Sequence, residues 1–257
     1  LKDNLGYYIT CKETSRSIFI DISHSSSSIN KFFQNINTNN INKKDDLIIL
    51  TTHKHADHSG GNEEASNLFQ REFGFPLSIY GEVRYDQTPG VTHPVNDGDV
   101  FEVGNLTVRV LHTPCHTRGS VCYHITTEGH PGALFTGDTL FVGGIGAFFE
   151  GNSDDMVSIF QRFVNVIPPE TIIYGGHDYA LNFLPNALSR DPNNIALANR
   201  LQWAQYHKEQ GTPAMPTTFQ DELETNLFLR VVSHTDEMAE LYPQWDREER
   251  NLSKLIS

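Results

Sequence analysis

The chain has 257 residues, a formal net charge of −13 and three cysteines. Its length suffices for one large α/β domain, alone or with a smaller appendage. The negative charge disfavours a nucleic acid as partner, because phosphate binding needs a surplus of Lys and Arg. The odd number of cysteines, Cys11, Cys115 and Cys122, fits a reducing compartment, so we expect free thiols and no disulfide framework.

The sequence gives no sign of membrane insertion or secretion. No stretch reaches the roughly 18 to 20 apolar residues of a membrane-spanning helix, and the first residues do not resemble a secretory signal. We therefore expect a cytoplasmic protein that binds no membrane. Because the chain begins at Leu1 and not at Met, a removed targeting segment stays open, and with it a mitochondrial location.

The first elements flank a run rich in Ser and Asn. Residues 6–22 predict a β-hairpin, because β-branched and aromatic residues lie on both sides of a charged turn at 12–15. Residues 25–42 predict a surface helix with a low-complexity loop that has no function. Residues 47–50 are all apolar and predict a short buried strand that ends directly in Thr51, Thr52 and His53.

The middle of the chain alternates short strands with helices. It contains no Gly-x-Gly-x-x-Gly turn, which favours a layered α/β domain over a dinucleotide-binding one. We expect strands at 77–80, 107–111, 121–125, 133–136 and 171–174, and helices at 63–73 and 154–166.

The character of the sequence changes after Tyr179. The pattern is helical over 186–209, Pro213 and Pro216 end it, and the charged end of the chain predicts further helices. We therefore expect a larger α/β domain at 1–179 and a smaller α-helical domain at 180–257.

The strongest functional signal is the segment THKHADHSGGN at 52–62. Directly after an apolar strand, it carries three histidines and one aspartate within six residues: His53, His55, Asp57 and His58. Imidazole nitrogens and carboxylate oxygens bind zinc and similar ions. A chance cluster of surface histidines does not explain why matching ligands occur later in the chain.

Three later residues complete this set. His116 lies in TPCHT, Asp138 in FTGDTL and His177 in YGGHD. Each follows an apolar strand and has Gly, Pro or Thr as neighbours, which is typical of loops gathered at one rim of a pair of sheets. Five histidines and two aspartates suffice for two metal ions that share a carboxylate.

The pattern T-H-x-H-x-D-H with a later His, Asp and His resembles the metallo-β-lactamase superfamily. The segments TPCHT, FTGDTLFV and FEG resemble the glyoxalase II family within it, and the similarity runs from Asp3 to about Arg230. The resemblance implies an αβ/βα sandwich with metals at its rim and a smaller α-helical C-terminal domain that binds substrate.

The resemblance also distributes the ligands over two divalent ions, zinc or possibly iron or manganese, since such sites discriminate weakly. One ion would be bound by His53, His55 and His116 and the other by Asp57, His58 and His177, with Asp138 as the bridge. Asp57 and Asp138 are thus the candidate catalytic residues.

The implied activity is hydrolysis of S-(2-hydroxyacyl)glutathione by metal-bound hydroxide, the second step of the glyoxalase pathway of methylglyoxal detoxification. The leaving thiol, with a pKa of about 8.5, needs no dedicated general acid.

The other candidates near the site are assigned lesser roles. His112 is a rival to His116, but the family's ligand is the histidine of Pro-Cys-His-Thr, so we expect a supporting role for His112. Cys115 is expected to be a buried structural thiol, since a thiolate beside the metals would compete as a ligand. The remaining histidines stand alone and are expected to bind no metal: His24, His93, His124, His130, His207 and His234.

The resemblance implies residues that hold the thiol carrier. Tyr179 matches the family's tyrosine, and Arg247 and Arg250 are candidates for its C-terminal basic pair, since Arg suits carboxylates. Alternatively, Arg247 and Arg250 lie on an exposed face of a helix and have no role in binding. Where the family commonly has Lys or Arg and then Tyr, this chain has Ala147 and Phe149. Phe149 thus occupies a substrate-binding position without a hydroxyl, which puts two polar contacts in doubt.

Several alternatives stay open. The same chemistry on a related thiol such as trypanothione is one, and a persulfide dioxygenase with a single iron is another. A β-lactamase fits less well, because amides have basic leaving groups. A non-catalytic metal-binding module is disfavoured because the ligand set is complete. We expect a small-molecule thioester as the only partner and a monomeric protein.

Overall fold

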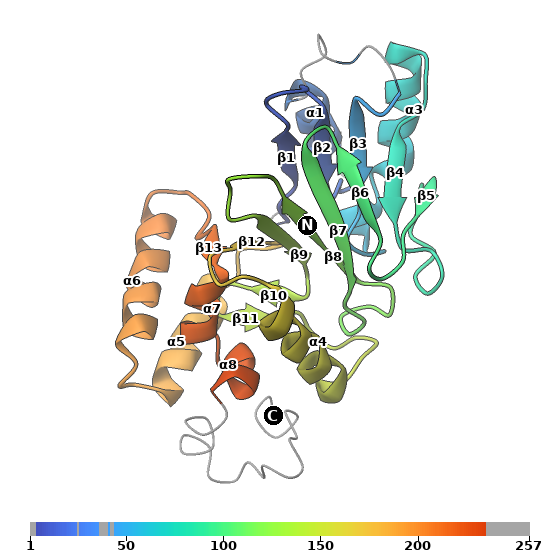
Figure 1. Ribbon diagram of the computed structural model, residues 1–257. Helices are drawn as coiled ribbons and strands as arrows, with labels where there is room; N and C mark the ends of the chain where they lie inside the picture. Colours follow the sequence, from blue (N-terminus) through green and yellow to red (C-terminus); the bar gives the residue numbers. More distant parts are fainter. Residues whose placement is uncertain (1–3, 25, 36–40, 42–43, 235–257) are drawn as a thin grey trace.

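The structure is a computed structural model, and it describes residues 4–24, 26–35, 41 and 44–234. Two sheets face each other, and helices cover their outer faces, so the expected αβ/βα sandwich is confirmed (Figure 1). None of the helices in this part of the chain is both long and apolar enough to cross a membrane.

The first sheet has the strand order β1-β2-β3-β4-β5. β1 and β2 form the antiparallel hairpin expected from residues 6–22, and the following pairs are parallel. The strands are β1 (Tyr7–Thr10), β2 (Ser17–Ile20), β3 (Leu47–Leu50), β4 (Ser78–Gly81) and β5 (His93–Pro94).

The second sheet has the order β13-β12-β9-β8-β7-β6, and a separate hairpin joins β10 to β11. In this sheet only β9 and β12, among the described strands, run parallel. The strands are β6 (Val100–Val103), β7 (Leu106–His112), β8 (Val121–Thr126), β9 (Ala133–Gly137), β10 (Leu140–Phe141), β11 (Gly144–Ile145), β12 (Ile172–Gly175) and β13 (Thr217–Thr218).

Successive side chains of a strand point to opposite faces of its sheet, so each strand contributes to two layers of the core. Ile48 and Leu50 of β3 point into the core between the sheets, where they meet Val108 and Val110 of β7. The other two residues of β3, Leu47 and Ile49, face outward onto α1 (Ser26–Asn35) and α3 (Asn62–Phe73). The outer face of the second sheet is covered by α4 (Ser153–Val166) in the same way.

The Ser/Asn-rich segment differs from its prediction. The helix expected there is present as α1, but Ile29 and Phe32 are 2% and 0% exposed and pack into the core against the first sheet. It is therefore an amphipathic layer of the sandwich and not only a surface helix. The polar composition of the segment does not reveal its buried face, because two apolar residues are enough for a short helix to form one apolar stripe.

The C-terminal region is helical, as expected, but its first helix was placed wrongly. The pattern at 186–209 is interrupted, because α5 ends at Arg190 and the side chain of Asn194 caps the next helix by accepting from the Leu197 amide. The helices are α5 (Ala180–Arg190), α6 (Ile195–Glu209), α7 (Phe219–Thr225) and α8 (Leu227–Ser233).

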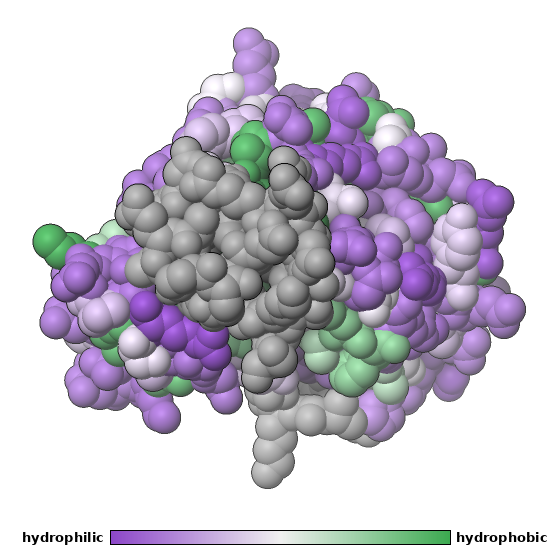
Figure 2. Space-filling model, turned by 90° about the horizontal axis from the view of Figure 1, so that it is seen from below, coloured by the Kyte–Doolittle hydropathy of each residue, from purple (hydrophilic) through white to green (hydrophobic). Residues whose placement is uncertain are grey.

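These helices hold the β10-β11 hairpin in place. Asn226 donates its side-chain amide to the carbonyls of Phe141 and Gly144, and Glu222 accepts from the Gly143 amide. Glu222 is fully buried, and burial raises its pKa. Figure 2 views the molecule from below, and hydrophilic residues cover most of the described surface on that face, in keeping with the net charge of −13.

Candidate metal centre

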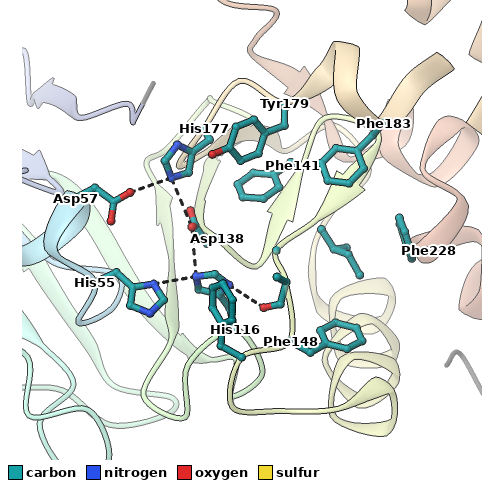
Figure 3. Close-up of a pocket in the computed structure, with 14 residues that line it drawn as sticks. His55, Asp57, His116, Asp138, Phe141, Phe148, His177, Tyr179, Phe183 and Phe228 are labelled. Atoms are coloured by element: carbon teal, nitrogen blue, oxygen red, sulfur yellow. Dashed lines mark hydrogen bonds and ion pairs between the residues drawn. The ribbon is translucent and has the colours of Figure 1, made fainter. Parts of the chain in front are cut away.

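The seven predicted ligands come from segments that follow strands, and the structure brings all of them together. Figure 3 shows His55, Asp57, His116, Asp138 and His177 around the cavity. His53 follows β3, Asp138 follows β9 and His177 follows β12. The short helix α2 (Ala56–Ser59) carries Asp57 and His58. His116 lies in the turn between β7 and β8, so each sheet supplies part of the site.

His53, His55 and His116 form one group, in which the three ligand nitrogens lie within 4.8 Å of one another. The Nδ1 atom of His55 is 3.1 Å from Nε2 of His53 and 3.0 Å from Nε2 of His116. These are the residues that the sequence assigns to the first ion.

Asp57, His58 and His177 form the second group. The Nε2 atoms of His58 and His177 are 3.3 Å apart, and Oδ2 of Asp57 lies 3.5 Å from Nε2 of His177. This group matches the residues that the sequence assigns to the second ion.

Asp138 lies between the two groups. Its Oδ2 atom is 3.3 Å from Nε2 of His116 in the first group and 3.5 Å from Nε2 of His177 in the second. Its Oδ1 atom is 3.4 Å from Nε2 of His58. One buried carboxylate therefore reaches donors of both groups, as a bridging ligand must.

The arrangement of donor atoms fits divalent cations. The ring nitrogens of His53 and His116 both converge on Nδ1 of His55, and the Oδ1 atom of Asp138 is buried without a hydrogen-bond partner among the described residues. Buried polar atoms are normally satisfied. Nitrogen and carboxylate donors converging in this way can bind divalent metal ions.

The electrostatics of the cluster favour a neutral imidazole at His53 and a charged one at His177. Burial and the neighbouring histidines lower the pKa of His53 well below its usual value. Burial also lowers the pKa of His177, but hydrogen bonds to Asp138 and Asp57 outweigh it and raise that pKa to about 10. Without a cation, the positive charge of protonated His177 balances these carboxylates. A bound metal ion would supply that positive charge instead.

Asp21 orients one ligand residue, His58, and is not among the residues predicted from the sequence. Its Oδ2 atom lies 2.8 Å from Nδ1 of His58, and its carboxylate accepts from both the amide and the hydroxyl of Thr52. The Nε2 atom of His58 is thereby aimed at the metal group. Like the ligands, Asp21 directly follows an apolar strand, β2, but no motif accompanies it in the sequence.

Lys54, between the first two ligands, joins three loops. Its Nζ atom lies 2.5 Å from Oε1 of Glu150 and 3.4 Å from Oδ1 of Asp86. The buried carboxylate of Asp86 also accepts from Thr117 Oγ1 and the Gly119 amide. The loops that carry His55 and His116 are thus linked to each other and to the loop at 146–151.

His112 lies outside both ligand groups. Its Nε2 atom donates to the carbonyl of Arg118 at 2.8 Å, and its ring stacks on Tyr85. It therefore braces the turn that carries His116, in agreement with the supporting role predicted for it. The six isolated histidines also lie outside the ligand groups found among the described residues.

All three cysteines are free and buried, as expected. The thiol of Cys115 donates to the carbonyl of Asn152, and burial raises its pKa to about 12. It is therefore protonated at neutral pH and unsuited to act as a nucleophile.

A cavity of about 640 Å³ opens beside the metal groups. None of the described residues that line it is Lys or Arg, and most of this wall is apolar: Phe141, Ile145, Phe148, Phe149, Phe183 and Phe228. Tyr179 lines it too, with its ring stacked on His177 at a centroid distance of 4.9 Å.

Phe149 lies at the mouth of the cavity. It is 68% exposed, and its ring centroid is 5.1 Å from that of His116. Ala147 is exposed beside it. Arg247 and Arg250, the predicted basic pair, lie outside the described residues.

The fold and the donor set define the class. The family model "Metallo-beta-lactamase superfamily" matches residues 30–177, and "Hydroxyacylglutathione hydrolase C-terminus" matches residues 178–255. A chain titled ETHE1 from Myxococcus xanthus superposes with a TM-score of 0.59 and 23% identity, over 91% of this chain and 87% of that one. A metallo-beta-lactamase from Staphylococcus aureus gives 0.61 and 21%, over 95% and 64%. The protein is a metal-binding hydrolase of the metallo-beta-lactamase superfamily.

Two relatives show to which family within the superfamily the chain belongs. "Hydroxyacylglutathione hydrolase cytoplasmic" of Arabidopsis thaliana is 40% identical over 185 residues, which cover 71% of this chain and 69% of the relative. "Hydroxyacylglutathione hydrolase-like protein" of Gallus gallus is 38% identical over 195 residues, covering 74% and 66%. The chain, which matches about two thirds of the length of these relatives, belongs to the hydroxyacylglutathione hydrolase family, also called glyoxalase II.

Proposed function

We propose that this protein hydrolyses the thioester of S-(2-hydroxyacyl)glutathione, such as S-lactoylglutathione, to glutathione and a 2-hydroxy acid. This is the second step of the glyoxalase pathway, which detoxifies methylglyoxal. The observation that carries the proposal is the position of Asp138 between two complete ligand groups at the floor of an open cavity. The relatives named hydroxyacylglutathione hydrolase support the same reaction.

We infer two divalent ions, zinc or a mixture with iron or manganese. His53, His55 and His116 would hold one and Asp57, His58 and His177 the other, with Asp138 as the shared ligand. When bound, the ions lower the pKa of a water from about 15.7 to near 7 and polarise the thioester carbonyl.

The residues of the chain supply positioning and exclude water. The apolar wall formed by Phe141, Ile145 and Phe148 keeps solvent away from the reacting carbonyl, and a drier site strengthens the electrostatics within it. Apart from the proposed ligands and Tyr179, none of the described residues that line the cavity is ionisable. A leaving thiol with a pKa of about 8.5 needs no general acid. The site therefore suits thioesters better than amides.

Tyr179 is our candidate for binding the thiol carrier from the cavity wall. The stacking of its ring on His177 fixes it beside the second ligand group. Ala147 and Phe149 offer no charge on the opposite side of the opening. A carrier with less negative charge than glutathione, such as trypanothione, is for this reason the second candidate.

Steady-state kinetics on a panel of thioesters test the proposal. We expect hydrolysis of S-lactoylglutathione and of the trypanothione thioester, release of free thiol, and no oxygen uptake with glutathione persulfide. Oxygen uptake without thioester hydrolysis would identify a persulfide dioxygenase. Failure of the metal-loaded protein on the whole panel would indicate a non-catalytic metal-binding module.

The remaining assignments are proposals of the same kind. A cytoplasmic location follows the printed name of the Arabidopsis relative. A monomer and the division into a catalytic domain at 1–179 and a substrate-binding domain at 180–257 rest on the sequence pattern. The two family models meet between residues 177 and 178, close to that boundary.

A further inference from the structure

A second cavity, of about 450 Å³, lies on the outer face of the second sheet, where α4 ends. Two cross-strand pairs form its floor, Arg109 opposite His124 and Thr107 opposite Thr126. The next pair on this face contains Leu111, which is covered by α4. The cavity thus begins where the helix no longer shields the strands.

The polar groups of this cavity are donors. Arg109 is exposed and forms no ion pair with any described residue, although Glu102 lies on the neighbouring strand. Arg162 of α4 reaches the same cavity. No Asp or Glu is among the lining residues in the part of the chain that the structure describes. The chain has a net charge of −13, but two guanidinium groups make the charge at this cavity locally positive.

His124 is the buried member of this group. It is 8% exposed, and its Nε2 atom has no hydrogen-bond partner among the described residues. Burial, followed by the charge of Arg109, lowers its pKa. A bound anion would offset both effects, so the ring reports on occupancy of the cavity.

Asp97 and the carbonyl end of α4 lie nearby and oppose an anion. Asp97 pairs with Nη1 of Arg162 at 2.8 Å, which engages one edge of that guanidinium. The carbonyl end of α4 contributes about half a negative charge. Arg109 has no carboxylate partner among the described residues, so its guanidinium donors can reach an anion in the cavity.

We propose that this cavity binds the phosphate group of a small phosphomonoester. Arginine forks match phosphate oxygens in pairs, and the hydroxyls of Thr107 and Thr126 add donors for an oxyanion with more acceptors than a carboxylate. Apolar walls from Leu111, Val166 and Ile167 leave room for a compact organic group beside the phosphate. The site is separate from the metal centre and does not depend on the proposed hydrolysis.

Proton NMR of the metal-loaded protein tests the proposal. The ring signal of His124, assigned with His124→Gln, is followed during titration with phenyl phosphate, inorganic phosphate and benzoate. We expect saturable shifts with both phosphates, tighter binding of phenyl phosphate and much weaker binding of benzoate. Equal affinity for benzoate would contradict a phosphate site.

A pair of charge-matched variants locates the binding. Arg109→Gln should weaken phenyl phosphate by about ten- to a hundredfold, as expected for loss of a charge-assisted contact. Arg71→Gln removes the same charge from an exposed position on α3 and should leave the affinity unchanged. The proposal is overturned if Arg109→Gln binds as tightly as the unmodified protein, because the ligand would then occupy the metal centre, or if both variants lose affinity equally.

Discussion

The Nδ1 atom of His116 donates a hydrogen bond of 2.8 Å to the backbone carbonyl of Ala147. This bond places the Nε2 lone pair of His116 toward the ligand group and fixes the loop at 146–151 relative to it. Because the contact uses the backbone, it is independent of the side chain at position 147. Residue 147 can therefore vary in charge without loss of the metal ligand.

Restoring the two polar groups of this loop should improve binding of glutathione. We expect Ala147→Lys with Phe149→Tyr to lower KM for S-lactoylglutathione by about ten- to a hundredfold, the effect of a charge-assisted contact, and to leave kcat almost unchanged, as for uniform binding away from the reacting carbonyl.

Gln70→Lys is the matched control, since it adds the same charge at an exposed position of α3. If KM for the unmodified enzyme is already low and the double substitution has no effect, the remaining carrier-binding residues suffice.

Metal content should be close to two ions per chain. Two ligand groups share Asp138, and loss of either ion leaves its donors buried and unsatisfied. Elemental analysis of freshly purified protein, alongside the thioesterase rate, measures this. Full activity at one ion per chain would contradict the dinuclear proposal.

Substitutions at Asp138, His116 and His112 should separate ligands from a bracing residue. Asp138→Asn and His116→Ala should each reduce kcat/KM by more than about a hundredfold, since loss of a residue that only orients a ligand costs about ten- to a hundredfold. His112→Ala removes a bond to the Arg118 carbonyl and should be far milder. Metal content measured on each variant distinguishes a lost ion from a slower reaction, and equal losses for the two histidine variants would overturn the ligand assignment.

The buried carboxyl of Glu222 should make stability depend on pH. Burial raises its folded pKa above the usual 4.5, so its contribution to stability is fully present below pH about 4.5 and is lost as the pH rises through the raised value. Relative to Glu222→Gln, the unmodified protein should therefore lose free energy of unfolding between about pH 5 and about pH 8.

Urea unfolding of both proteins at the two pH values measures this difference. Glu224→Gln, at an exposed position of the same helix, should follow the unmodified protein. A pH-independent difference between Glu222→Gln and the unmodified protein would mean that Glu222 does not titrate in this range.

The sequence predicts the ligand set because each ligand follows a strand whose apolar run is readable by itself. It does not reveal Asp21, a single carboxylate without a motif, or the contact between Lys54 and Glu150, whose partners are far apart in the chain. The break between α5 and α6 was also missed, because the apolar periodicity continues on both sides of it. The features that local sequence patterns determine could be predicted. The contacts between residues far apart in the chain could not.

The pairing of β13 with β12 covers the edge of a strand that leads into the site. Thr217 and Thr218 pair with Ile173 and Ile172 on the outer side of the strand that leads to His177. An uncovered strand edge is a template for addition of strands from other chains. By occupying that edge with only two residues, β13 ends the sheet in a form too short to recruit a neighbour, so the C-terminal region also guards the chain against aggregation.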